Sequence, residues 1–320
     1  MPFTEIVTPF LPTFPSKRSP PSPKKIALLA DAFERNLLRH IENLISAAIG
    51  GDPPPSTPIG LSCLSNAVDV LSSIHAEAGV LFSGPSVSGT ESILASYLDE
   101  SVKLLDFCNS VSAEIESLSR RRLLIRFAVH VLSSSSGTGE EKLRRARDSI
   151  SDWEKENSTP SAAPVDLAPA PRGKISGHGA IYAVGAVSAI VAGSLSAALN
   201  GGSSEGCGGV SVSGEFPWAD ALHRLESAMS GEKERSIGEF VHVDIAVRAL
   251  AEVLDKGVET ETETETEGLS NAVNEVKRAM DELSNGLERL TNAVNGLFRA
   301  VLGSRNLALQ KFRLCPRKCK

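Results

Sequence analysis

Apolar residues recur at alternating intervals of four and three along residues 269–301, toward the carboxyl end of the chain. This heptad spacing places them on one side of a helix. The predicted helix-packing seam consists of Leu269, Val273, Val276, Met280, Leu283, Leu287, Leu290, Val294, Leu297 and Val301. One flank of this seam carries only Ala and Gly, which favours close antiparallel packing within one chain. A coiled coil with a second copy or with a partner protein is the alternative.

A second heptad pattern predicts a longer helix at residues 90–133. Apolar side chains occupy nine of the eleven heptad positions between Tyr97 and Leu132. A helix of this length extends over about 65 Å, so it needs packing partners along it. Arg122 interrupts the seam, and its side chain must therefore reach solvent or find a polar partner.

Shorter amphipathic patterns predict helices at 26–48, 59–80, 140–153, 217–229 and 237–254, separated by stretches rich in Gly, Pro or Ser. Together the patterns predict an all-α protein built as a long antiparallel helical bundle. The expected organisation is a disordered tail at 1–25, an N-terminal long-helix bundle at 26–156, a linker at 157–174, an uncharged apolar segment at 175–204, C-terminal helices packing on the bundle at 215–310, and a basic tail at 311–320.

The apolar segment at 175–204 contains no charged side chain when His178 is taken as neutral, and it is long enough to cross a membrane. Ala, Ser and Gly make up most of residues 180–199, so the segment is only marginally apolar enough for insertion. Small residues at intervals of four would allow another helix to approach closely. The residues that represent this candidate membrane-associated helix are Ala180, Gly185, Ala189, Gly193, Ala197 and Leu199. The alternative is an Ala-rich helix buried in the bundle.

Composition and charge narrow the function classes. Aromatic residues make up 5 % of the chain, which argues against β-sandwiches, barrels and base-stacking platforms. The net charge of −6 argues against a nucleic-acid-binding protein. Five of the acidic residues lie in a Glu-Thr run at 259–267, which predicts a solvated acidic loop. The basic tail would attract an anionic membrane surface.

No motif for catalysis, nucleotide binding or metal binding is recognisable in the sequence. It lacks the P-loop, GxGxxG, HExxH and GxSxG patterns, and its five Cys have no zinc-ligand spacing. The six His are isolated, and His130 and His242 lie in apolar helices, where we expect core or boundary histidines. We therefore expect no catalytic residue, no cofactor and no metal site. The odd number of scattered Cys favours free thiols.

Four stretches resemble the plant BYPASS family of developmental regulators. They are AFERNL at 32–37, YLDESVKLLDFCN at 97–109, RARDSISDW at 145–153 and Trp218-Ala219, and the second is the most specific. The resemblance covers about residues 26–310. It implies a plant protein without a known enzyme activity, since family members restrain production of a mobile, carotenoid-dependent root signal that arrests shoot growth. Some relatives have been linked to exocytic machinery.

These features predict a non-enzymatic regulator of plant root and shoot development that acts through protein–protein contacts on helical surfaces. The alternative is a membrane-associated adaptor in vesicle trafficking or exocytosis, which would use residues 180–199 and the basic tail. An enzyme of small-molecule metabolism is disfavoured by the missing motifs. Protein partners are expected through helical surfaces, and nucleic acid is not expected. A membrane surface is an open alternative, and a homo-oligomer is an alternative that the sequence does not support. Membrane and cytoplasmic locations both fit, and the basic residues in 1–25 give weaker support for a chloroplast location.

Overall fold

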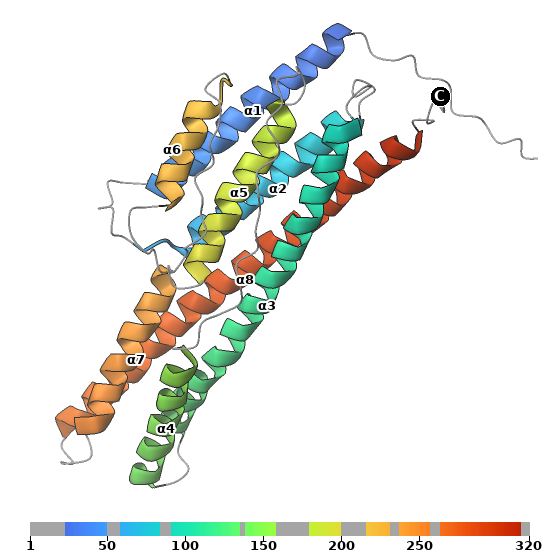
Figure 1. Cartoon of the computed structure of the whole chain (residues 1–320). Coiled ribbons are helices and arrows are strands. Elements are labelled where there is room, and N and C mark those ends of the chain that lie inside the picture. Colours follow the sequence, from blue (N-terminus) through green and yellow to red (C-terminus); the bar gives the residue numbers. More distant parts are fainter. Residues whose placement is uncertain are drawn as a thin grey trace, which may run out of the picture.

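Eight α-helices make up almost all of the described chain in the computed structural model (Figure 1). The structure describes residues 23–49, 58–83, 91–134, 138–157, 179–199, 216–230, 237–256 and 263–314. The helices are α1 (Pro23–Ile49), α2 (Leu61–Ser83), α3 (Glu91–Ser133), α4 (Gly139–Asn157), α5 (Gly179–Leu199), α6 (Ala219–Ser230), α7 (Gly238–Lys256) and α8 (Glu263–Leu314). The predicted all-α class is confirmed.

The two longest helices, α3 and α8, run antiparallel through the length of the molecule (Figure 1). Their register is set by two contacts: Arg122 of α3 donates to Ser284 of α8, and Arg305 of α8 donates to the carbonyl of Leu98. α4 folds back along α3, where the Ser149 hydroxyl donates to a carbonyl of α3 at 2.7 Å. The long antiparallel bundle is therefore present in this part of the chain, and Arg122 has the polar partner that the interrupted seam required.

Another side of α8 carries α7 and α2, which lie end to end with their N-termini together. Ile59 and Ile237 form an isolated parallel bridge at the junction, and it is the one β-type pairing among the described residues. Both carboxylate oxygens of Glu239 accept the Leu61 backbone N–H at 3.0 Å. This carboxylate caps the first turn of α2, where backbone N–H groups have no partner within the helix.

α2 departs from the antiparallel arrangement, because it runs parallel to α8. Gly286 of α8 faces Leu61 at the start of α2, and Ser304 of α8 faces Gly79 near its end. A Cβ atom on Gly286 would lie 2.6 Å from Leu61 Cδ1, so the helices approach very closely there. The small flank of the predicted seam therefore allows close approach, but to a parallel neighbour. Only helices joined by short turns must run antiparallel, and α2 and α8 are far apart in sequence.

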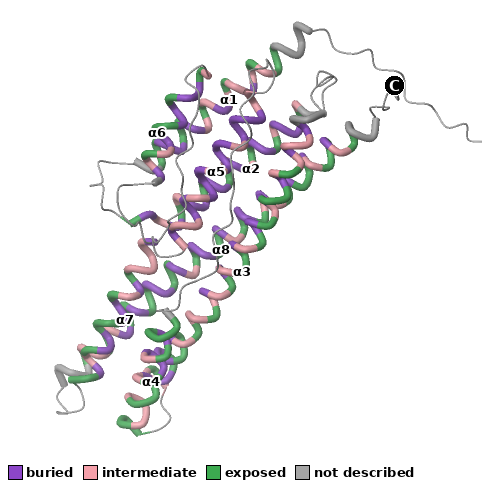
Figure 2. Tube along the Cα trace, viewed as in Figure 1, coloured by how far each residue is buried: buried purple, intermediate pink, exposed green. Residues whose placement is uncertain are grey.

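The remaining helices complete one end of the bundle. α1 packs on α2, where Asn36 and His40 both reach the Glu77 carboxylate, at 3.3 Å and 3.1 Å. α6 lies against α1 and α5, and α5 packs on α2 and α3. Figure 2 shows buried residues along the inner sides of these helices. Side chains from all eight helices form one continuous hydrophobic core.

The predicted helix boundaries differ from the observed ones mainly at the ends of α8. The Glu-Thr run at 259–267 was predicted to be a loop, but α8 begins at Glu263 and includes its second half. Acidic residues are favourable in the first turn of a helix, which explains this extension. α8 also continues to Leu314, into the predicted basic tail at 311–320. Of the predicted tail at 1–25, residues 1–22 lie outside the described residues, whereas 23–25 belong to α1. Of the predicted linker at 157–174, Asn157 ends α4 and the rest lies outside the described residues, as do residues 259–262 and 315–320. The predicted division into segments stays a prediction.

Candidate functional site

The structure places the predicted seam of α8 at the centre of the bundle. Nine of its ten residues are buried, and Leu269 in the second turn of α8 is half-buried. Four of them, Val276, Leu283, Leu290 and Val301, have no exposed surface. The seam therefore contacts α2, α3 and α7 of the same chain and is not available to a partner.

The residues chosen for the candidate membrane helix lie on the more exposed side of α5. Ala180, Gly185, Ala189, Gly193, Ala197 and Leu199 are all half-buried, whereas the bulky Ile, Val and Leu residues before Leu199 are buried. α5 is the one described helix that is long and apolar enough to cross a membrane, with a mean hydropathy of 1.8. Of that apolar stretch, 67 % is buried inside the bundle. A core helix has the same length and composition, so this is weak evidence for a membrane span.

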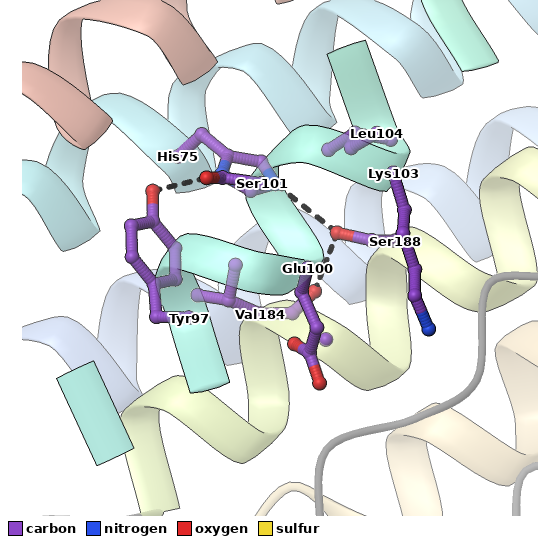
Figure 3. A pocket seen from close by; sticks show the side chains of 9 residues that line it. His75, Tyr97, Glu100, Ser101, Lys103, Leu104, Val184 and Ser188 are labelled. Atoms are coloured by element: carbon purple, nitrogen blue, oxygen red, sulfur yellow. Dashed lines mark hydrogen bonds between the residues drawn. The ribbon is translucent and has the colours of Figure 1, made fainter. Parts of the chain in front are cut away.

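A buried polar cluster joins α5 to α2 and α3 (Figure 3). His75 of α2 is 2 % exposed; its Nε2 lies 3.1 Å from Ser188 Oγ of α5, and its Nδ1 lies 3.4 Å from Tyr97 Oη of α3. The Ser188 hydroxyl donates to the Val184 carbonyl at 2.7 Å, so it accepts from the imidazole. This arrangement fits a neutral histidine that donates through Nε2 and accepts from Tyr97 through Nδ1.

Burial dominates the electrostatics of the cluster. It lowers the pKa of His75 to about 4 and raises the pKa of Tyr97 to about 12, so both side chains are neutral at pH 7. Burial also raises the pKa of the nearby Glu100 to about 7; Lys103 opposes this shift and Asp99 adds to it. The cluster is therefore uncharged at its centre, with one titratable carboxyl at its rim.

A cavity of about 20 Å³ lies beside the cluster, lined by His75, Glu100 and Ser188 among others (Figure 3). This volume holds about one water molecule. The polar groups are thus suited to bridging helices through a hydrogen-bonded network rather than to enclosing an organic ligand. Within the described ranges, no three His, Cys, Asp or Glu side chains lie close enough together to hold a metal ion.

An aromatic cluster fixes the first turns of α5. The Phe216 and Trp218 rings stack with centroids 4.7 Å apart. The Tyr182 ring of α5 packs against both, with centroid distances of 5.9 Å to Phe216 and 6.0 Å to Trp218. Trp218 is fully buried, and its Nε1 has no hydrogen-bond partner among the described residues. The Trp218-Ala219 motif thus connects α5 with the start of α6.

The histidines of the chain illustrate what the sequence pattern missed. His130 and His242 were predicted to be core or boundary residues. This was wrong for His130, which is exposed, whereas His242 is exposed but lies at the boundary of α7 and α8, with its Nδ1 3.9 Å from Glu282 Oε2. His75 was not singled out, although it is the one buried histidine among the described residues. Its signal was its position inside the apolar face of α2, directly after the buried Ile74. Whether an isolated histidine in an apolar helix is buried or exposed can be assigned only when the orientation of the helix is known.

Comparisons with known proteins show that this chain is similar to plant proteins. Residues 25–157 match the family described as Protein ROH1-like. The chain is 29 % identical to Protein BPS1, chloroplastic, from Arabidopsis thaliana over 235 residues, which cover 68 % of this chain and 64 % of that protein. It is also similar to UPF0496 protein 4 from Oryza sativa, with 29 % identity in subsp. japonica and 28 % in subsp. indica. Each rice match covers 57 % of this chain and 44 % of the rice protein.

These matches confirm the resemblance to the plant BYPASS family that the sequence motifs indicated. The matched region spans less than two thirds of BPS1 and less than half of the rice proteins. None of the relatives' names describes an enzyme. No solved structure matches the chain.

Proposed function

We propose that this protein is a non-enzymatic regulator of plant development that acts through protein–protein contacts on the outer faces of its long helices. The similarity to BPS1 supports the developmental role. The observation that carries the contact mode is the outer face of α3, where Leu123 and Phe127 are 55 % and 51 % exposed one helical turn apart. Exposed apolar side chains that cluster on a regular face mark interaction surfaces. In line with the family resemblance, the regulated process is production of the mobile root signal that limits shoot growth.

Grafting tests this proposal. Roots that lack the BYPASS-type activity would express this chain beneath normal shoots, and the expected result is restored shoot growth. A Leu123→Glu/Phe127→Glu variant should accumulate normally but fail to restore growth, because it loses the exposed apolar pair. Ile245→Glu is the matched control, since Ile245 is 61 % exposed on α7, and it should restore growth. Failure of the unaltered chain at normal abundance would overturn the proposal.

The length and hydropathy of α5 favour a second candidate, a membrane-associated adaptor in vesicle trafficking. An adaptor anchored through α5 should stay with membranes from plant cells during alkaline carbonate extraction. An Ala189→Glu change would place a carboxylate in the candidate span and should release an anchored protein. Complete release of the unaltered chain by carbonate would exclude the anchored form of this candidate.

A further inference from the structure

The side of α3 that faces away from the bundle carries an exposed stripe at heptad spacing. Val102, Leu123 and Phe127 are 40 %, 55 % and 51 % exposed. Asn109 and Glu116 are also exposed and lie between them in the same stripe. Val102, Asn109, Glu116 and Leu123 occupy the same heptad position, so they form one line along the helix. This stripe is separate from the buried seam through which α3 contacts α8.

We propose that the stripe is the interface of a homodimer in which α3 packs antiparallel against α3 of a second copy. The twofold axis lies between Ser112 and Ala113, in the middle of the stripe. This register places Val102 of each copy opposite Leu123 of the other. Small residues at the axis allow the helices to approach closely, and a twofold interface requires such self-complementarity.

Charge complementarity selects this antiparallel register. It brings Asp106 of one copy beside Arg120 of the other, twice by symmetry, and it brings the Asn109 amide beside the Glu116 carboxylate. Asp106 and Arg120 are exposed, and neither forms an ion pair within the described part of the chain. A parallel in-register dimer would instead place each charged residue beside its own copy, which is unfavourable. In this antiparallel register the opposite-charge contacts lie next to the Val102–Leu123 apolar pairs.

The two charged residues cannot interact within one chain. They are fourteen positions apart on a continuous helix, which corresponds to about 21 Å along its axis. Any energetic coupling between them must therefore pass through a second copy. This separation makes a charge exchange a specific test of the proposed register.

Sedimentation equilibrium of the purified full chain provides the test. The wild type should form a dimer that dissociates on dilution, as expected for a modest interface. Arg120→Glu and Asp106→Arg should each raise the dimer Kd at least about tenfold, because each places like charges together at two contacts. The double variant Asp106→Arg/Arg120→Glu should restore the wild-type Kd. Circular dichroism should show unchanged helicity, since both residues are exposed.

Cysteine cross-linking provides a second readout. Ala113→Cys should form a disulfide-linked dimer under mild oxidation, because the two copies of this residue meet next to the axis. Ala76→Cys is the matched control, an exposed alanine on α2, and it should remain monomeric. A wild type that is monomeric at hundreds of micromolar, or a double variant as weak as the single ones, would overturn the proposal. Equal cross-linking of the two Cys variants would also overturn it. Because the stripe includes the Leu123/Phe127 pair of the proposed function, the dimer would be the protein contact of that proposal. If the chain is monomeric, restored shoot growth in the grafting test still supports the proposed function, with a different protein on this face.

Discussion

The parallel contact between α2 and α8 leads to a sharp prediction at two glycines of α8. Gly286 and Gly296 both face α2, ten residues apart. A Cβ atom at Gly286 would lie 2.6 Å from Leu61 Cδ1 and 3.0 Å from Leu61 Cβ. A Cβ atom at Gly296 would have no neighbour closer than Ser72 Oγ at 3.9 Å. The same Gly→Ala change therefore meets a tight contact at Gly286 and only an ordinary van der Waals contact at Gly296.

The expected free energies follow from two terms. Alanine favours a helix interior by about 1 kcal/mol over glycine, and this gain applies at both sites. Overpacking at Gly286 costs about 1–3 kcal/mol, and we expect the upper part of this range. Leu61 is fully buried, and its backbone N–H is held by Glu239, so it has little room to move. Gly286→Ala should thus destabilise the fold by about 2 kcal/mol, whereas Gly296→Ala should stabilise it by about 1 kcal/mol.

Urea unfolding of the full chain, followed by far-UV circular dichroism, measures both changes. The two midpoints should move in opposite directions, with unchanged slopes. Gly303→Ala is an additional control, since nothing lies within 4 Å of its Cβ position, and it should behave like Gly296→Ala. In a double-mutant cycle, Leu61→Ala should cost less in the Gly286→Ala background than in the wild type. A Gly286→Ala variant as stable as Gly296→Ala would refute the close parallel approach of α2 and α8.

Three further predictions concern the cluster and the core. The pKa of His75 is about 4 in the folded state and about 6.5 in the unfolded state. The free energy of unfolding should therefore fall by about 3 kcal/mol as the pH falls from 6.5 to 4. In urea titrations at different pH values, the His75→Gln variant should not show this loss. The pKa of Glu100 is raised to about 7 in the folded state, so the free energy of unfolding should fall as the pH rises from 4.5 to 7 and this carboxyl ionises. Glu100→Gln should therefore be more stable than the wild type above about pH 7. Equal stability of the two proteins there would contradict the raised pKa. Leu283→Ala should lower the free energy of unfolding by about 2–5 kcal/mol because Leu283 is fully buried. Leu302 is exposed, so Leu302→Ala should lower it by less than about 1 kcal/mol. Similar losses of stability in the two variants would contradict the assigned burial.

Heptad spacing predicted the long helices well because burial along one helix face is a local property of the sequence. The seam from Leu269 to Val301 and the helix at 91–133 both follow this spacing. Helix direction is not local in the same way. The parallel pairing of α2 with α8 depends on contacts between Leu61 and Gly286 and between Gly79 and Ser304. These pairs are more than 200 residues apart in sequence, and heptad spacing alone does not specify which helices pair.

The polar cluster of His75, Tyr97 and Ser188 could not be predicted from the sequence pattern for a related reason. His75, Tyr97 and Ser188 come from three helices and follow no motif, and each alone is an ordinary residue. Tyr97 was placed in the seam of its helix by spacing, and it is indeed 2 % exposed. What the pattern could not supply is the position of α5, which brings Ser188 to the imidazole. The candidate site thus depends on the one segment whose placement the sequence left open.

Large and small side chains are arranged on α5 in the opposite way to those of a membrane-spanning helix. In a membrane, small residues usually face neighbouring helices, and bulky apolar residues face the lipid. In α5 the bulky Val187, Val191 and Leu195 are buried against the bundle, whereas the small Gly185, Ala189 and Gly193 are half-exposed. On the buried side of α5, Ser188 accepts a hydrogen bond from His75, and this bond would be lost if that side faced lipid. Insertion of α5 into a membrane would expose the hydrophobic surfaces of α2 and α3 that it now covers. The observed arrangement is therefore that of a core helix.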